Sequence, residues 1–171
     1  RYCRERCVKV FLTLNTLLTD RGLGEAANVL RRASAMGVDA VLVQDWGVLT
    51  LAQAVVPDLP IHASTQMSLH TLGGANYAAQ LGMERVVLSR ELSKGEIAEI
   101  CRQCPAEIET FIHGALCMCY SGQCTMSALI GQRSAHSRSL TLVRLTAASI
   151  SALSVVLQLF LRRTLSRRWR L

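Results

Sequence analysis

Five short apolar segments recur at similar intervals along the first two thirds of the chain, and this rhythm limits the fold more than any other feature. The segments occupy residues 9–15, 39–45, 60–65, 84–89 and 107–113. Parallel strands that are covered on both faces have such nearly continuous apolar runs, because neither face meets water. Each interval leaves room for one helix. The rhythm therefore predicts a series of βα units with about five parallel strands.

The segments between these runs carry the signals of helices. Small and apolar residues at helical spacing run from Leu23 to Gly37, and a glycine in that place can end a helix in the left-handed conformation. Ser93 and Glu96 have the spacing of a capping box, which predicts a helix directly after Ser93. Two shorter helices are predicted at about residues 48–55 and 71–81.

Polar side chains stand at the end of each predicted strand. An open doubly wound sheet and a (β/α)8 barrel both fit the rhythm, but a barrel collects functional side chains at the C-terminal ends of successive strands. We therefore predict an α/β fold, a partial (β/α)8 TIM-like barrel, since a complete barrel usually takes ~250 residues. A single Asn or Asp after a strand is also a common helix cap, and each histidine can equally be structural. The polar residues are Asn15, Gln44, Asp45, His62, Ser64, Thr65, Gln66, Arg90, Glu91 and His113.

The end of the chain has a different composition. Residues 137–171 contain no Asp, Glu, Lys, Gly, Pro or Cys and consist mainly of Ser, Leu, Arg, Thr, Ala and Val. We expect a frameshift product of a GC-rich gene or, as the less favoured alternative, a membrane anchor at the uncharged residues 145–161. The tail is predicted to be helical or disordered, and the partial barrel is assigned to residues 1–136.

The net charge of +7 comes from this tail, because residues 133–171 contain eight arginines and no acidic residue. The rest of the chain is close to neutral, so the overall charge alone gives no argument for nucleic-acid binding. Seven cysteines, together with a charged N-terminal segment that lacks the apolar core of a signal peptide, predict reduced thiols in a cytoplasmic protein. No membrane partner is predicted.

Three of the cysteines lie within residues 109–124, close to a glutamate and a histidine. Cys117 and Cys124, with a glycine between them, suit a loop that holds an iron–sulfur cluster through thiolates. Zinc is the weaker alternative, because the paired Cys-x2-Cys spacing is absent here, and Cys119 has no assigned role. Two further alternatives stay open: Cys117 as a nucleophile with His113 as its base, or purely structural cysteines.

The same stretch resembles a known family. The motif E-x-F-x-x-G-A-L-C-x4-G-x-C-x-M-S over residues 109–127 resembles the signature of the U-thirty-two peptidase family, the collagenase-like proteases. The resemblance covers about residues 8–136, and the chain is shorter than the family's pattern at both ends. Further blocks that are similar to the family, in the same order, are KVFLTLNT, VDAVLVQDWGVL, IHASTQM, RVVLSREL and GQRSAH.

This resemblance implies an enzyme in the intact parent. The members most similar in these blocks hydroxylate a tRNA uridine or a ribosomal-RNA cytidine by prephenate-linked chemistry, which implies RNA as the substrate. The family was named for proteolysis, so a peptidase that acts on a collagen-like peptide is the alternative. Relatives with an iron–sulfur cluster imply Cys117 and Cys124 as the first two of four ligands, with the others beyond Ser137. A non-catalytic cluster-binding assembly partner is the third alternative.

If the strands converge, their polar ends and the cysteine loop share one pocket. The catalytic candidates are then His113, Glu109, Asp45, His62 and Arg90. The metal ligands are Cys117 and Cys124, and the substrate-binding candidates are Asn15, Gln44, Ser64, Thr65, Gln66 and Glu91. For an RNA substrate, Arg85, Arg90 and Arg133 can contact phosphate, and Trp46 and Tyr120 can stack on bases. The alternative for each arginine is a solvated surface position or an internal ion pair.

Overall fold

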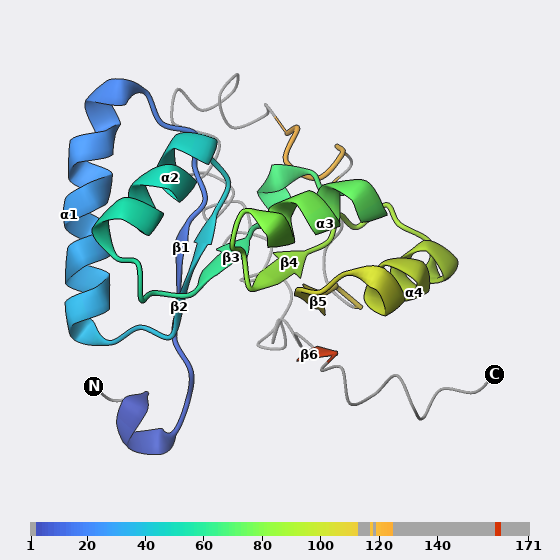
Figure 1. Cartoon of the computed structure of the whole chain (residues 1–171), viewed down its shortest axis with the longest axis horizontal. Helices are drawn as coiled ribbons and strands as arrows, with labels where there is room; N and C mark the ends of the chain where they lie inside the picture. Colours follow the sequence, from blue (N-terminus) through green and yellow to red (C-terminus); the bar gives the residue numbers. More distant parts are fainter. Residues whose placement is uncertain (1–2, 113–116, 118, 125–159, 162–171) are drawn as a thin grey trace, which may run out of the picture.

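Five parallel strands in sequence order form the centre of the protein (Figure 1). The computed structural model describes residues 3–112, 117, 119–124 and 160–161. A two-residue strand, β6 (Phe160–Leu161), pairs antiparallel with the last of the five. The parallel strands are β1 (Phe11–Leu14), β2 (Ala40–Val43), β3 (Ile61–Ala63), β4 (Arg85–Val87) and β5 (Glu107–Glu109).

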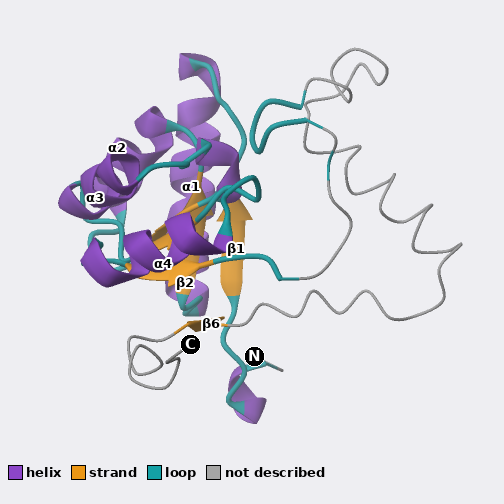
Figure 2. Ribbon diagram, turned by 90° about the vertical axis from the view of Figure 1, so that its right-hand side faces the viewer, coloured by secondary structure: helices purple, strands orange, loops and turns teal. Residues whose placement is uncertain are grey.

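One α-helix connects each strand to the next. Figure 2 shows α2, α3 and α4 on the same side of the sheet, and α1 packs beside α2. When every crossover is right-handed and steps to the adjacent strand in the same direction, all helices fall on one face. A doubly wound sheet carries helices on both faces instead. The predicted partial barrel is therefore confirmed. The helices are α1 (Asp20–Met36), α2 (Trp46–Val55), α3 (Leu72–Gln80) and α4 (Lys94–Gln103), with the short 3-10 helices η1 (Arg4–Arg6) and η2 (Thr65–Met67).

The local signals of the sequence act where they were predicted. Gly37 ends α1 in the left-handed conformation, at φ 69°, and its N–H bonds back to the last turn. The Ser93 side chain accepts a hydrogen bond from the backbone N–H of Glu96, whose carboxylate accepts one from the backbone N–H of Ser93. This capping box satisfies two donors that the first turn of α4 otherwise leaves unpaired.

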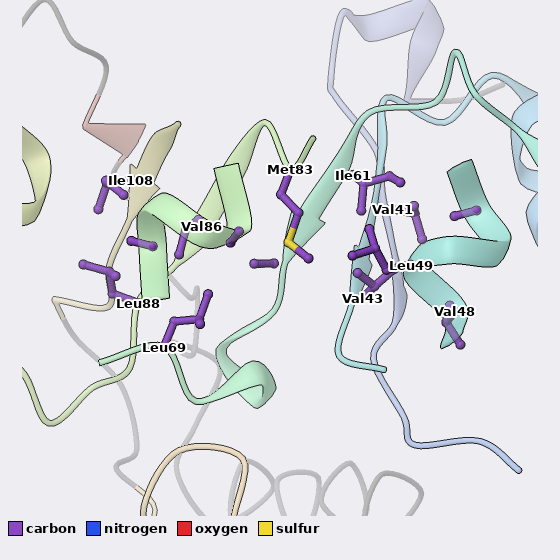
Figure 3. Close-up of a cluster of buried hydrophobic side chains, with 14 of the residues drawn as sticks. Val41, Val43, Val48, Leu49, Ile61, Leu69, Met83, Val86, Leu88 and Ile108 are labelled. Carbon is purple, nitrogen blue, oxygen red and sulfur yellow. The ribbon is translucent and has the colours of Figure 1, made fainter. Parts of the chain in front are cut away.

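The helix-facing side of the sheet forms the core (Figure 3). Val41 and Ile61 pair in register on adjacent strands and pack with Leu49 of α2. Val86, Leu88 and Ile108 continue the cluster under α3 and α4. Because successive side chains of a strand alternate between faces, the other face carries Phe11, His62, Arg85 and Glu107. We call this second face the inner face, since it lies toward the interior of the partial barrel.

The predictions for the C-terminal tail fall almost entirely outside the described residues. Only Phe160 and Leu161 of residues 137–171 are described, and they form β6. Within the described part of the chain, no helix combines the length and the apolar character that a bilayer crossing needs.

Candidate functional site

The C-terminal ends of β1 and β3 meet through a direct side-chain contact. The Nδ2 of Asn15 donates a hydrogen bond to the Oγ of Ser64, 3.1 Å away. Ser64 also caps the helix η2, where it accepts from the backbone N–H of Gln66. The Oδ1 of Asn15 is buried and has no hydrogen-bond partner among the described residues. This edge, which we call the barrel mouth, therefore brings together two of the predicted substrate-binding residues, and Thr65 and Gln66 lie beside them in η2.

Two predicted residues at the end of β2 have different surroundings. Gln44 follows the strand and is partly buried. Asp45 is the N-cap of α2, where its carboxylate accepts hydrogen bonds from the backbone N–H groups of Val48, at 3.1 Å, and Leu18, at 3.2 Å. Both carboxylate oxygens are thus used, one to fix the start of α2 and the other to hold the loop that follows β1. This geometry corresponds to the helix-cap alternative for an Asp after a strand.

His62 and Glu109 lie on the inner face. His62 is 5% exposed, and its ring packs edge-on against the Phe11 ring at a centroid distance of 5.2 Å. Burial lowers the pKa of His62 to about 4, and the positive charge of Arg85 adds to the effect. Arg85 binds the buried carboxylate of Glu109 and the more exposed one of Glu107. Burial raises the pKa of the Glu109 carboxyl, and Arg85 opposes that shift.

The other predicted residues lie at the end of β4, against the segment that contains the cysteines. We call the described residues 117 and 119–124 the cysteine loop. The backbone N–H of Ser121 donates to Oε1 of Glu91 at 2.8 Å, and the Ser121 hydroxyl donates to the same atom at 3.1 Å. Arg90 donates to the Ser121 hydroxyl through its backbone N–H and its Nε. Arg90 and Glu91 therefore bind the cysteine loop, which is coloured orange in Figure 1.

Three cysteines of this loop gather their sulfur atoms. The Sγ atoms of Cys117, Cys119 and Cys124 all lie within 4.8 Å of one another. A backbone hydrogen bond from Cys119 lowers the pKa of the Cys117 thiol, and the charge of Arg90 acts in the same direction. A side-chain hydrogen bond with Cys124 raises the pKa of the Cys119 thiol. Three soft sulfur ligands at this spacing can hold a metal ion that prefers thiolates.

Comparison with known proteins agrees with the family resemblance of the sequence and with the fold. The sequence profile of peptidase family U32 matches residues 1–139. The chain belongs to this family.

Two relatives of this U32 family member are named for RNA hydroxylation. A 23S rRNA 5-hydroxycytidine synthase of Escherichia coli is 43% identical over 128 residues, which are 75% of this chain and 19% of that protein. A tRNA hydroxylation protein P of Escherichia coli is 40% identical over 126 residues, which are 73% of this chain and 28% of that protein. The chain thus spans less than a third of the length of either relative.

A solved structure of a U32 peptidase has the same fold. It superposes with a TM-score of 0.55 at 20% sequence identity, over 64% of this chain and 47% of that one. At this identity the likeness supports the architecture alone. The U32 family member described here thus shares the fold of a known family structure over about two thirds of its length.

The structure of this U32 chain divides the predicted site into two groups. Asn15, Ser64, Arg90 and Glu91 lie at the mouth, together with the cysteine loop. His62 and Glu109 belong to the buried network of the inner face, where Arg85 is 8% exposed and ion-paired. The prediction that Arg85 contacts phosphate is therefore wrong. His113 and Arg133 lie outside the described residues.

Sequence reasoning about this U32 chain missed three residues of the mouth. Cys119 had no assigned role, yet its sulfur lies with those of Cys117 and Cys124. The Cys-x-Cys spacing was the available signal, but it does not reveal on which side of a loop a side chain lies. No sequence signal points to Ser121 or Ser68, because their hydrogen-bond partners are distant in sequence. Ser121 is fully buried, and the Ser68 hydroxyl donates to its carbonyl oxygen at 2.6 Å.

Proposed function

We propose that this chain is the metal-binding barrel portion of an RNA-hydroxylating protein. In the intact protein it binds an iron–sulfur cluster and adds a hydroxyl group to a tRNA uridine or a ribosomal-RNA cytidine. The names of the two relatives support RNA as the substrate class. The single observation that carries the proposal is the trio of sulfur atoms at the barrel mouth.

The donor set fits part of an iron–sulfur site. Such clusters are usually held by four thiolates, and the cysteine loop brings three sulfur atoms within 4.8 Å of one another. Cys117 and Cys124 are the two ligands of the original prediction, and Cys119 is a third candidate. The remaining coordination comes from outside the described residues. A bound cluster would supply one-electron redox chemistry at this edge.

The surroundings of the loop suit a nucleotide base. Tyr120 is 69% exposed and lies next to the cysteines, so its ring offers a stacking face. Its centroid is 6.3 Å from that of His70. Of the three arginines predicted to contact phosphate, Arg90 is the one that the described residues place next to the cysteine loop.

The test measures modified nucleosides in the organism that encodes the chain. Deletion of the gene for the intact protein should remove one hydroxylated nucleoside from tRNA or 23S rRNA, as seen by mass spectrometry of digested RNA. Re-expression of the intact protein should restore it, and re-expression with Cys117→Ala should not. Glu25→Ala, an exposed change on α1, is the matched control and should restore it. An unchanged nucleoside profile in the deletion strain would refute the proposal.

Proteolysis is the second candidate, and the Cys117 thiol favours it. Its lowered pKa and its exposure are properties of a nucleophilic cysteine. This candidate predicts that the intact protein cleaves gelatin and that Cys117→Ala abolishes the cleavage. An assembly partner without catalysis would give neither gelatin cleavage nor a changed nucleoside, and would co-purify with another protein.

A further inference from the structure

Ser121 is the point at which the cysteine loop is attached to the barrel. It is fully buried, although its neighbour Tyr120 is 69% exposed. Its backbone N–H and hydroxyl both donate to Glu91, the hydroxyl accepts from Arg90, and its carbonyl accepts from the Ser68 hydroxyl. Every polar group of Ser121 therefore has a partner on the loops that follow β3 and β4. A backbone segment with this many fixed bonds has little freedom to rotate.

The next residue allows the loop to approach this closely. Gly122 has φ +80°, a conformation that side chains with a Cβ rarely adopt. A Cβ built at this position would lie 2.3 Å from the carbonyl oxygen of Gln66 and 2.5 Å from the Ser68 Oγ. The Gln123 side chain then donates to Ser68 at 3.1 Å. Residues 121–123 are thus bonded to, or in close contact with, the segment that follows β3.

Ser68 itself is held in an uncommon conformation. Its φ of 57° places it in the left-handed region, which a non-glycine residue adopts only at a cost in free energy. The imidazole of His70 lies 2.7 Å from its carbonyl oxygen and also 3.2 Å from Glu91. Ser68 and Glu91 are therefore linked through His70 as well as through Ser121. The loop rests on one connected set of hydrogen bonds.

The three cysteines flank this attachment point at short distances along the chain. Cys119 precedes Ser121 by two residues, and Cys124 follows it by three. We propose that Glu91 and Ser68 are positioning residues that hold Ser121 and Gly122, and so preorganise the three thiols for metal binding. This inference rests on the proposed metal site. It adds that the barrel, and not the loop alone, sets the metal affinity.

The expected magnitude follows from the behaviour of residues that orient metal ligands. Loss of such a partner typically lowers metal affinity about 10–100-fold. Glu91→Ala removes the acceptor of two Ser121 hydrogen bonds, and Gly122→Ala places a methyl group against the Gln66 carbonyl. Both substitutions should lower the metal affinity by an amount in that range. Glu91→Gln keeps an acceptor oxygen and should stay within about threefold of the unchanged chain.

The experiment titrates the 171-residue chain with Co²⁺ alone, without oxygen, and follows the thiolate-to-cobalt charge-transfer band. Glu91→Ala and Gly122→Ala should bind Co²⁺ about 10–100-fold more weakly with a reduced band, while Glu91→Gln and the control Glu25→Ala keep both. Circular dichroism checks that each variant is folded. If Glu91→Ala does not fold, Ser121→Ala replaces it, since it removes the hydroxyl and keeps the N–H bond to Glu91.

Two results would overturn the inference, and the second would also overturn the proposed metal site. If Glu91→Ala and Gly122→Ala bind Co²⁺ like the unchanged chain while Cys117→Ala does not, the thiols are the ligands but the barrel does not position them. If Cys117→Ala also binds Co²⁺ unchanged, the thiol site itself is wrong, and the proposed cluster fails with it. The first result leaves the proposed function intact.

Discussion

Acid should destabilise this protein through His62. Its imidazole is buried against Phe11, and its pKa is about 4 in the folded chain against an ordinary value of 6.5. Between these values the unfolded chain binds a proton that the folded chain excludes. The contribution of His62 to stability is therefore fully present above pH 6.5 and is lost as the pH falls toward 4. At 1.36 kcal/mol for each pKa unit, linkage gives a loss of about 2 kcal/mol between pH 7 and pH 5.

The assay compares the pH dependence of three proteins. Urea unfolding followed by circular dichroism gives the free energy of unfolding at the two pH values for the unchanged chain, His62→Leu and His62→Gln. The unchanged chain should lose about 2 kcal/mol more than either variant. Leucine keeps an apolar contact with Phe11 and glutamine keeps polarity, so their stabilities at pH 7 should differ. Neither side chain titrates, and the pH-dependent loss should be reduced equally in both.

Two further measurements make the test specific. Met36→Gln, an exposed change at the end of α1, should keep the full loss of the unchanged chain. An NMR titration of the His62 ring should give a pKa near 4 directly. The reasoning is refuted if the unchanged chain and both His62 variants lose the same free energy between pH 7 and pH 5, since burial would then not hold this imidazole neutral.

Three further predictions concern the inner face, a helix cap and the metal site. Arg85→Met should lower the free energy of unfolding, measured in urea, by about 3 to 5 kcal/mol, because it leaves the buried Glu109 without its guanidinium partner. The control Arg102→Met, at an exposed ion pair, should change it by no more than about 0.5 kcal/mol. Equal losses in the two variants would contradict this prediction. Ser93→Ala should cost about 1 kcal/mol in the same assay, and Ser93→Asp, which keeps a capping oxygen, should recover most of it. Chelator added to the Co²⁺-loaded chain should lower its melting temperature, and Cys117→Ala should show no such shift, because only binding to the folded state stabilises it.

The fold could be predicted because its signals are local. A buried parallel strand needs a short apolar run, and the five runs all became strands, each somewhat shorter than the run that predicts it. Gly37 and Ser93 act on backbone groups within a few residues of themselves, so their roles follow from the sequence alone. The choice of a barrel over a doubly wound sheet required one further inference, namely that the polar residues at the ends of successive strands meet at one edge of the sheet.

The site could be predicted only in part, because it depends on which face each side chain takes. Adjacent positions of a strand point to opposite faces, so an uncertainty of one residue moves a side chain from the core to the inner face. Position along the strand matters as well: His62 and Ser64 are two positions apart and so share a face, but His62 lies within β3 and Ser64 just after it, and only Ser64 is bonded to a residue of the mouth. The partnership of Glu91 with Ser121 joins residues 30 positions apart. No spacing rule reveals it.

The separation of the polar residues into two groups indicates where chemistry can occur. On the inner face, Arg85 and Glu109 neutralise each other while buried, and His62 is held neutral, so these groups contribute to stability and their charges are already compensated. At the mouth, the three thiols lie together, Cys117 is exposed, and the neighbouring Tyr120 is exposed as well. A substrate can therefore gain new contacts at the mouth without breaking buried ion pairs. Under the proposed function, substitution of the exposed Cys117 or Tyr120 should change activity at constant stability, whereas substitutions on the inner face should change stability.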